Sequence, residues 1–214
     1  MRKLILGLTA AASAVLAGCG QPPNRSTGVY MLIDTSGTYT KEIQEAQAII
    51  NVILATLEPS DAFAVARVDT ASFSEKDIVA KMQFDDRPSV ANQQKRQFKE
   101  DIDSFVGGVA PSSHTDITGG VLQASEFLME KGSGRKVIFI FSDLQEDLPE
   151  GYVRDLPLDL RGVTVVALNV TKLRTDNIDP RLYQGRIEDW RTRVEAGGGT
   201  FRVINDLDGL ALPF

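Results

Sequence analysis

Oxygen-bearing side chains gather in this sequence where long apolar runs end. One group directly follows the run VYMLI at 29–33, and another side chain comes just after the run VIFIF at 137–141. Carboxylates and hydroxyls are hard ligands that suit Mg²⁺, Mn²⁺ or Ca²⁺ better than zinc or copper. Two carboxylates nearly neutralise a dication and leave it able to accept a carboxylate from outside. The candidate ligands are Asp34, Ser36, Thr38, Thr115 and Asp143.

The elements that must position these side chains alternate along the chain between strands and helices. Short β-rich apolar runs predict strands at 29–33, 63–68, 78–84, 137–141, 163–168 and 200–204. Apolar residues at helical spacing predict helices from Lys41 to about Leu57, from Ser89 to about Phe105, over 117–128 and around 187–194. This alternation predicts an α/β fold with a doubly wound, mostly parallel six-stranded sheet. Helices cover both faces, and 78–84 forms a short antiparallel edge strand.

The predicted topology brings the candidate ligands together. In a doubly wound order such as 3-2-1-4-5-6, the first and fourth strands are neighbours where the winding reverses. Asp34 ends the first strand and Asp143 follows the fourth, so both carboxylates should lie side by side at the carboxyl edge of the sheet. Thr115, in the loop before the third helix, should approach the same edge.

These residues resemble the metal-ion-dependent adhesion site of von Willebrand factor A (VWA) domains. The segment DTSGT, from Asp34 to Thr38, looks like the family's D-x-S-x-S/T motif, and Thr115 and Asp143 match its loop threonine and strand-end aspartate. The resemblance covers about 28–214 and is specific at 28–57 and 111–143. Leu144 departs from the pattern, because the family often has glycine there.

The resemblance implies a Rossmann-like VWA fold and a protein-binding function rather than an enzymatic one. All five ligands would hold Mg²⁺, or Mn²⁺ or Ca²⁺, and a partner protein would add an Asp or Glu carboxylate. His114 and Asp116, which flank Thr115, are expected at the rim of the ligand site. His114 is the only histidine, and the sequence has neither a Gly-x-Ser-x-Gly elbow nor a P-loop.

Two alternatives use the same residues. In a haloacid-dehalogenase-like phosphohydrolase, Asp34 would be the nucleophile toward phosphate, and Asp143 with Asp147 would mimic the paired metal carboxylates. That superfamily usually has a second aspartate where Ser36 stands. It also needs a lysine near the phosphate, and only Lys131 and Lys136, upstream of Asp143, are suitably placed. The other alternative is an envelope scaffold that binds no metal.

The N-terminus has the features of a bacterial lipoprotein signal. Two basic residues precede an uncharged run at 4–16, which is too short to span a bilayer. The segment LAGC at 16–19 resembles a lipobox, which implies cleavage before Cys19 and acylation of its thiol. We therefore predict a signal peptide at 1–18, a lipidated tether at 19–27 and one domain at 28–214. The implied location is the cell envelope, and Gly20 implies the outer membrane, facing the periplasm or the surface, in a Gram-negative cell.

Composition excludes two classes of protein. The formal net charge is −6, with 23 basic and 29 acidic residues, so the chain lacks the basic surface that binds nucleic acid. One cysteine cannot form a disulfide within the chain. With 214 residues, the chain can bury a core without disulfides or structural metals.

Overall fold

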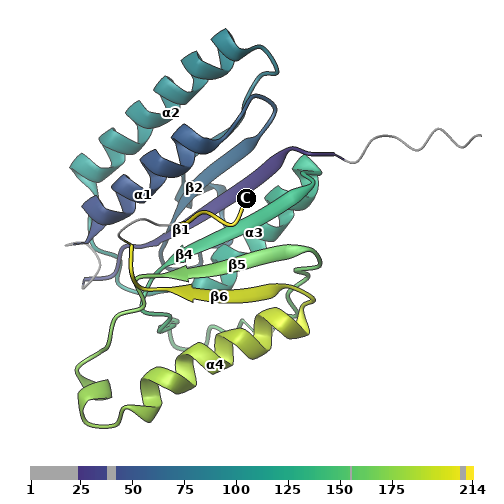
Figure 1. Ribbon diagram of the computed structural model, residues 1–214. Helices are drawn as coiled ribbons and strands as arrows, with labels where there is room; N and C mark the ends of the chain where they lie inside the picture. The colour runs from purple at the N-terminus through teal and green to yellow at the C-terminus, as the bar shows by residue number, and fades with distance from the viewer. Residues whose placement is uncertain (1–23, 38–41, 155, 208–210) are drawn as a thin grey trace, which may run out of the picture.

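The computed structural model describes residues 24–37, 42–154, 156–207 and 211–214, which form a six-stranded sheet between two layers of helices (Figure 1). The strand order is β3-β2-β1-β4-β5-β6. Neighbouring strands are parallel except β2 and β3, which are antiparallel. The predicted doubly wound sheet, its order and its antiparallel edge strand are all confirmed.

The strands follow the apolar runs closely, because each central strand is buried on both faces. Their bounds are β1 Thr27–Asp34, β2 Ala62–Val68, β3 Ile78–Gln83, β4 Arg135–Phe141, β5 Val163–Leu168 and β6 Thr200–Ile204. In the register of β1 and β4, Ile33 lies opposite Phe141. Asp34 and Ser142 therefore leave the sheet side by side.

Two helices cover each face of the sheet. The bounds are α1 Ile43–Thr56, α2 Pro88–Gly108, α3 Ile117–Lys131 and α4 Arg181–Ala196, with short 3₁₀ turns η2 at Glu75–Asp77 and η3 at Thr175–Asn177. Helices α1 and α2 pack on one face, and α3 and α4 pack on the other (Figure 1). Alternate residues of β1 supply the two cores, with Tyr30 and Leu32 toward α3 and Met31 toward α1.

Helix α3 lies very close to the sheet at its first turn, where Gly120 faces β1 and Gly119 faces the residue that caps the helix. A β-carbon at Gly120 would lie 2.8 Å from a methyl group of Leu32, and one at Gly119 would lie 2.5 Å from a carboxylate oxygen of Asp116. A larger residue at Gly120 would therefore displace the Leu32 side chain of β1, and one at Gly119 would displace the carboxylate of Asp116. The close approach holds the loop before α3, which contains Thr115, against the carboxyl edge of the sheet.

Helix ends differ from the sequence prediction more than strands do. Helix α2 begins at Pro88 rather than at a Ser89 cap, because proline's fixed φ suits the first helical position, and it extends to Gly108. Helix α1 begins at Ile43, and the predicted start at Lys41 lies outside the described residues. Within the described part of the chain, no helix combines the length and the apolar character needed to cross a membrane.

Candidate metal centre

Asp34 is a buried carboxylate at the carboxyl end of β1. Its Oδ1 accepts a hydrogen bond from the backbone N–H of Ser36 at 2.8 Å, and its Oδ2 accepts one from the hydroxyl of Ser142 at 2.7 Å. Only 1% of the residue is exposed. Burial raises the pKa of Asp34, and these hydrogen bonds oppose that rise without cancelling it. The negative charge of Asp34 is therefore only partly compensated by its neighbours.

Asp143, two residues beyond β4, is the second buried carboxylate. Its Oδ1 accepts a hydrogen bond from the backbone N–H of Gln145 at 2.7 Å, and its Oδ2 has no hydrogen-bond partner among the described residues. Burial raises the pKa of Asp143 to about 6; the Gln145 hydrogen bond opposes this, and the negative charge of Asp34 adds to it. The two carboxylates thus repel each other across the site, as the predicted topology requires.

Thr115 reaches this edge on a loop that is tied to the segment after β4. Its backbone N–H donates to the carbonyl of Asp147 at 2.8 Å, and the N–H of Asp147 donates back at 3.0 Å. The residue is 4% exposed, and its hydroxyl has no hydrogen-bond partner in the described part of the chain. The loop therefore presents a hydroxyl oxygen that is available to a ligand.

Ser36 is held by the same loop from the other side. It forms a parallel bridge with Ser112, whose N–H donates to the carbonyl of Thr35 at 2.8 Å. The Ser112 hydroxyl donates to Asp69 at 2.6 Å and so connects the loop to the end of β2. Thr38, the fifth predicted ligand, lies outside the described residues.

The two predicted rim residues occupy different environments. His114 is partly exposed, with its Nδ1 3.4 Å from a carboxylate oxygen of Asp147, a contact that lacks hydrogen-bond geometry. Asp116 is fully buried rather than at a rim. Its Oδ1 accepts from the N–H of Gly119 at 2.8 Å and caps α3, while its Oδ2 accepts from Arg154 at 2.8 Å. Asp116 therefore positions Thr115 from inside the fold.

Comparisons with solved structures identify the architecture. The pilus adhesin SpaC of Lactobacillus rhamnosus GG, in an open conformation, aligns over 88% of this chain and 29% of its own, at 10% identity and a TM-score of 0.55. A von Willebrand factor type A protein from Catenulispora acidiphila aligns over 86% of this chain and 39% of its own, at 14% identity and a TM-score of 0.52. The chain has a VWA-like fold. It spans less than half the length of either protein, and neither a family model nor a curated protein matches its sequence.

Three side chains that support this VWA-like edge were not identified from the sequence. Ser142 donates to Asp34, and its hydroxyl also accepts the N–H of Leu144 at 3.0 Å. Arg186 of α4 donates from Nε to the carbonyl of Asp143 at 3.2 Å, and its other nitrogens bind the buried carboxylate of Asp176 at 2.9 and 2.8 Å. A small polar residue between a buried strand and Asp143 is a signal for Ser142. The Arg186 contact spans 43 residues and has no local signal.

The residues present at this edge fit a hard divalent cation. Asp143 and Thr115 each retain an oxygen atom without a partner among the described residues, beside a second carboxylate, Asp34, that is buried. The described residues contain no group of three or more His, Cys, Asp or Glu side chains suited to a metal. The predicted set has only two carboxylates, completed by neutral hydroxyls, so it balances the charge of a dication and leaves the ion able to accept a further oxygen ligand. Such a cation would also remove the repulsion between the carboxylates.

Proposed function

We propose that this protein is a lipid-anchored module of the bacterial cell envelope that binds a partner protein through a divalent cation. Asp34, Ser36, Thr38, Thr115 and Asp143 would hold the cation, Mg²⁺ or alternatively Mn²⁺ or Ca²⁺. The observation that carries this proposal is the pair of buried, mutually repelling carboxylates at the ends of β1 and β4, since burying two like charges is costly without a counter-ion.

The bound cation would supply a positive centre that accepts one further oxygen ligand. Asp34 and Asp143 carry the only charges in the predicted set, so they balance a dication without surplus. An Asp or Glu carboxylate on the partner is therefore the favoured incoming ligand. The remaining residues of the site position oxygens: Ser142 orients Asp34, and Asp116 holds the loop that presents Thr115.

The fold and the chain's first residues support an adhesive role at the cell envelope. One of the similar structures is a pilus adhesin, which supports a role in protein binding. Cys19 would carry the lipid, and the residues between it and Thr27, where β1 begins, would serve as the tether. Several acyl chains on one cysteine give stable membrane attachment, where a single chain does not.

Calorimetric titration of the protein with Mg²⁺, Mn²⁺ and Ca²⁺ tests the metal site. We expect binding by the native chain and none by Asp143→Ala, whereas Asp189→Ala, an exposed aspartate on α4, should bind as the native chain does. No binding of any of the three ions at about millimolar concentration by folded protein would refute the site and favour a scaffold without metal.

Capture from an envelope extract tests the partner. A protein retained in Mg²⁺ should be released by chelator and recaptured when Mg²⁺ is restored, and Thr115→Ala should weaken its retention without unfolding the chain. Equal retention in chelator would contradict a metal-mediated contact.

The phosphohydrolase alternative predicts turnover of phosphate monoesters that Asp34→Asn abolishes. A phosphohydrolase would need Asp147 beside Asp143 as its second metal carboxylate. In the structure the carboxylate of Asp147 is mostly exposed and lies toward His114. Among the described residues no lysine forms an ion pair with Asp34 or Asp143. We therefore expect no turnover with Mg²⁺. Reproducible hydrolysis by the native chain that is lost in Asp34→Asn would favour the phosphohydrolase over the binding module.

A further inference from the structure

A pocket of about 250 Å³ lies away from the candidate metal centre, between α3 and the segment that runs from η2 into β3. We call it the β3–α3 pocket. It opens at the edge of the sheet, because β3 is the last strand in the order. Its lining combines three acidic side chains and one lysine, Lys81, with amide and aromatic side chains, among them Phe73, Gln123, Glu126 and Phe127.

Gln123 provides a buried hydrogen-bond donor in this pocket. The residue is only 8% exposed, and its Oε1 accepts from the hydroxyl of Tyr30 at 3.1 Å. That bond fixes the amide so that Oε1 is used inside the fold. The Nε2 group has no partner among the described residues. Gln123 lines the pocket, so this amide group can donate to a carbonyl of a bound ligand.

Glu126 provides an unpaired acceptor one helical turn further along α3. Two other acidic side chains of the pocket have ionic partners, since Glu75 pairs with Lys81 at 2.5 Å and Glu130 pairs with Lys131 at 3.0 Å. Glu126 has neither an ion pair nor a hydrogen bond within the described part of the chain. Because residues three apart share a helix face, Glu126 and Gln123 are presented together.

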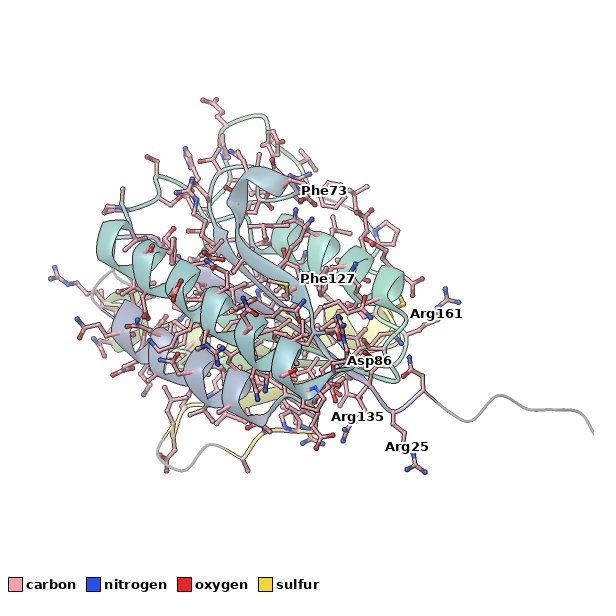
Figure 2. All side chains as sticks on the ribbon, turned by 90° about the horizontal axis from the view of Figure 1, so that it is seen from above. Arg25, Phe73, Asp86, Phe127, Arg135 and Arg161 are labelled. Carbon is pink, nitrogen blue, oxygen red and sulfur yellow. The ribbon has the colours of Figure 1, made fainter. Side chains whose placement is uncertain are left out.

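Aromatic rings complete the lining. Phe73 is 43% exposed, whereas Phe127 is only 8% exposed (Figure 2). The ring of Phe127 already attracts one cation, because the ammonium of Lys131 lies 5.6 Å from its centroid. An exposed ring, a free carboxylate and a free amide donor thus surround one cavity.

We propose that the β3–α3 pocket binds an arginine side chain of a partner polypeptide. The guanidinium would donate to Glu126 and stack on the exposed ring of Phe73, while a backbone carbonyl of the same peptide would accept from Nε2 of Gln123. A planar, weakly hydrated guanidinium suits this combination better than the compact ammonium of lysine. The contact uses no metal ion and is independent of the function proposed above.

Nuclear magnetic resonance of the ¹⁵N-labelled protein tests this site, with EDTA present to exclude any metal contribution. The probe is the peptide acetyl-Gly-Arg-Gly-amide, compared with the same peptide carrying lysine or the neutral isostere citrulline. The arginine peptide should shift the side-chain amide signals of Gln123. The citrulline peptide should bind about tenfold more weakly, because it lacks the charge.

Matched variants locate the contact. Glu126→Gln should weaken the arginine peptide about tenfold and leave the citrulline peptide unchanged. Phe73→Ala should weaken the arginine peptide too, and both side chains are exposed enough for the fold to persist. Glu100→Gln, an exposed glutamate on α2 across the sheet, should have no effect. Equal binding of citrulline or lysine, or unchanged binding by Glu126→Gln, would overturn the assignment.

Discussion

Replacing Asp143 with asparagine should make the metal-free protein more stable at neutral pH. Asparagine keeps the oxygen that accepts from Gln145 and removes the buried charge. The pKa of Asp143 lies at about 6, against an ordinary value of 3.8. A gap of about two pH units corresponds to about 3 kcal/mol of unfavourable interaction in the folded, ionised state.

The sign of the pH dependence follows from that raised pKa. Below about pH 4 the carboxyl is protonated in both the folded and the unfolded protein, so it adds no penalty. Between about pH 4 and 6 only the unfolded chain gives up the proton, and the free energy of unfolding falls as the pH rises. Above about pH 6 the whole penalty is present, so Asp143→Asn gains up to about 3 kcal/mol there and almost nothing at about pH 4.

Urea unfolding in EDTA across this pH range measures the difference between the two proteins. Asp189→Asn, an exposed aspartate on α4, is the control and should stay within about 0.5 kcal/mol of the native chain throughout. An Asp143→Asn variant that is less stable than the native chain at neutral pH, or a difference that does not change with pH, would refute the reasoning.

Mg²⁺ should bring the native chain and Asp143→Asn to nearly equal stability at neutral pH. At about a hundredfold excess over its dissociation constant, an ion that binds only the folded protein adds about 2.7 kcal/mol to the free energy of unfolding. The native chain should gain that amount, and Asp143→Asn should gain none. A native chain that gains nothing from the ion would leave the carboxylate pair without its proposed counter-ion.

Three further predictions concern the anchor, the loop before α3 and the loop after β4. Cys19→Ser should leave the membrane fraction or remain as an unprocessed precursor, because a hydroxyl cannot replace the thiol in acylation; normal fractionation and processing would contradict the lipobox. Asp116→Ala should lower the free energy of unfolding by about 2–4 kcal/mol, because α3 loses its cap and Arg154 loses its partner. Asp116→Asn keeps the cap and should lose less in the same urea assay. At position 144, stability should fall in the order Leu, Gly, Ala: both variants lose a buried side chain worth about 2–5 kcal/mol, but only glycine accepts the positive φ of 66° without strain. Thermal unfolding ranks the three, and an alanine variant more stable than the glycine variant would count against backbone strain at this position.

The sheet was predictable because its central strands, β1 and β4, contain uninterrupted apolar runs of ordinary strand length. The run VIFIF, for example, becomes β4 and lies next to β1, as the doubly wound order requires. The order of the parallel strands then determines which strand ends are neighbours, so the proximity of Asp34 and Asp143 followed from topology alone. The apolar runs and the right-handed connection between parallel strands were sufficient to predict the sheet and this pair of carboxylates.

The environment of Asp116 was not predictable, because it depends on a distant partner. A polar aspartate beside a ligand threonine is expected at a rim, yet Arg154, 38 residues later, neutralises it inside the fold. Arg186 and Asp176 form a similar pair behind Asp143. Such pairs come from segments without apolar periodicity, and only tertiary packing brings them together.

Leu144 illustrates a second reason why the sequence does not predict local backbone conformation. The sequence departs from the family pattern there, and the residue adopts the left-handed conformation that glycine favours, with its side chain buried in the core. A propensity argument expects leucine to avoid this conformation. Burial between α3 and α4 outweighs the backbone cost, so packing determines the course of the chain after Asp143.

The hydrogen bond from the indole Nε1 of Trp190 to the carbonyl of Leu144, 3.2 Å long, has a practical consequence. Trp190 is the only tryptophan in the chain, so all indole emission comes from a ring that contacts the residue after Asp143. Its intensity and wavelength depend on that hydrogen bond and on Arg193, whose guanidinium lies 4.4 Å from the ring centroid. The protein thus carries a built-in optical reporter directly behind the candidate metal centre, readable without labelling.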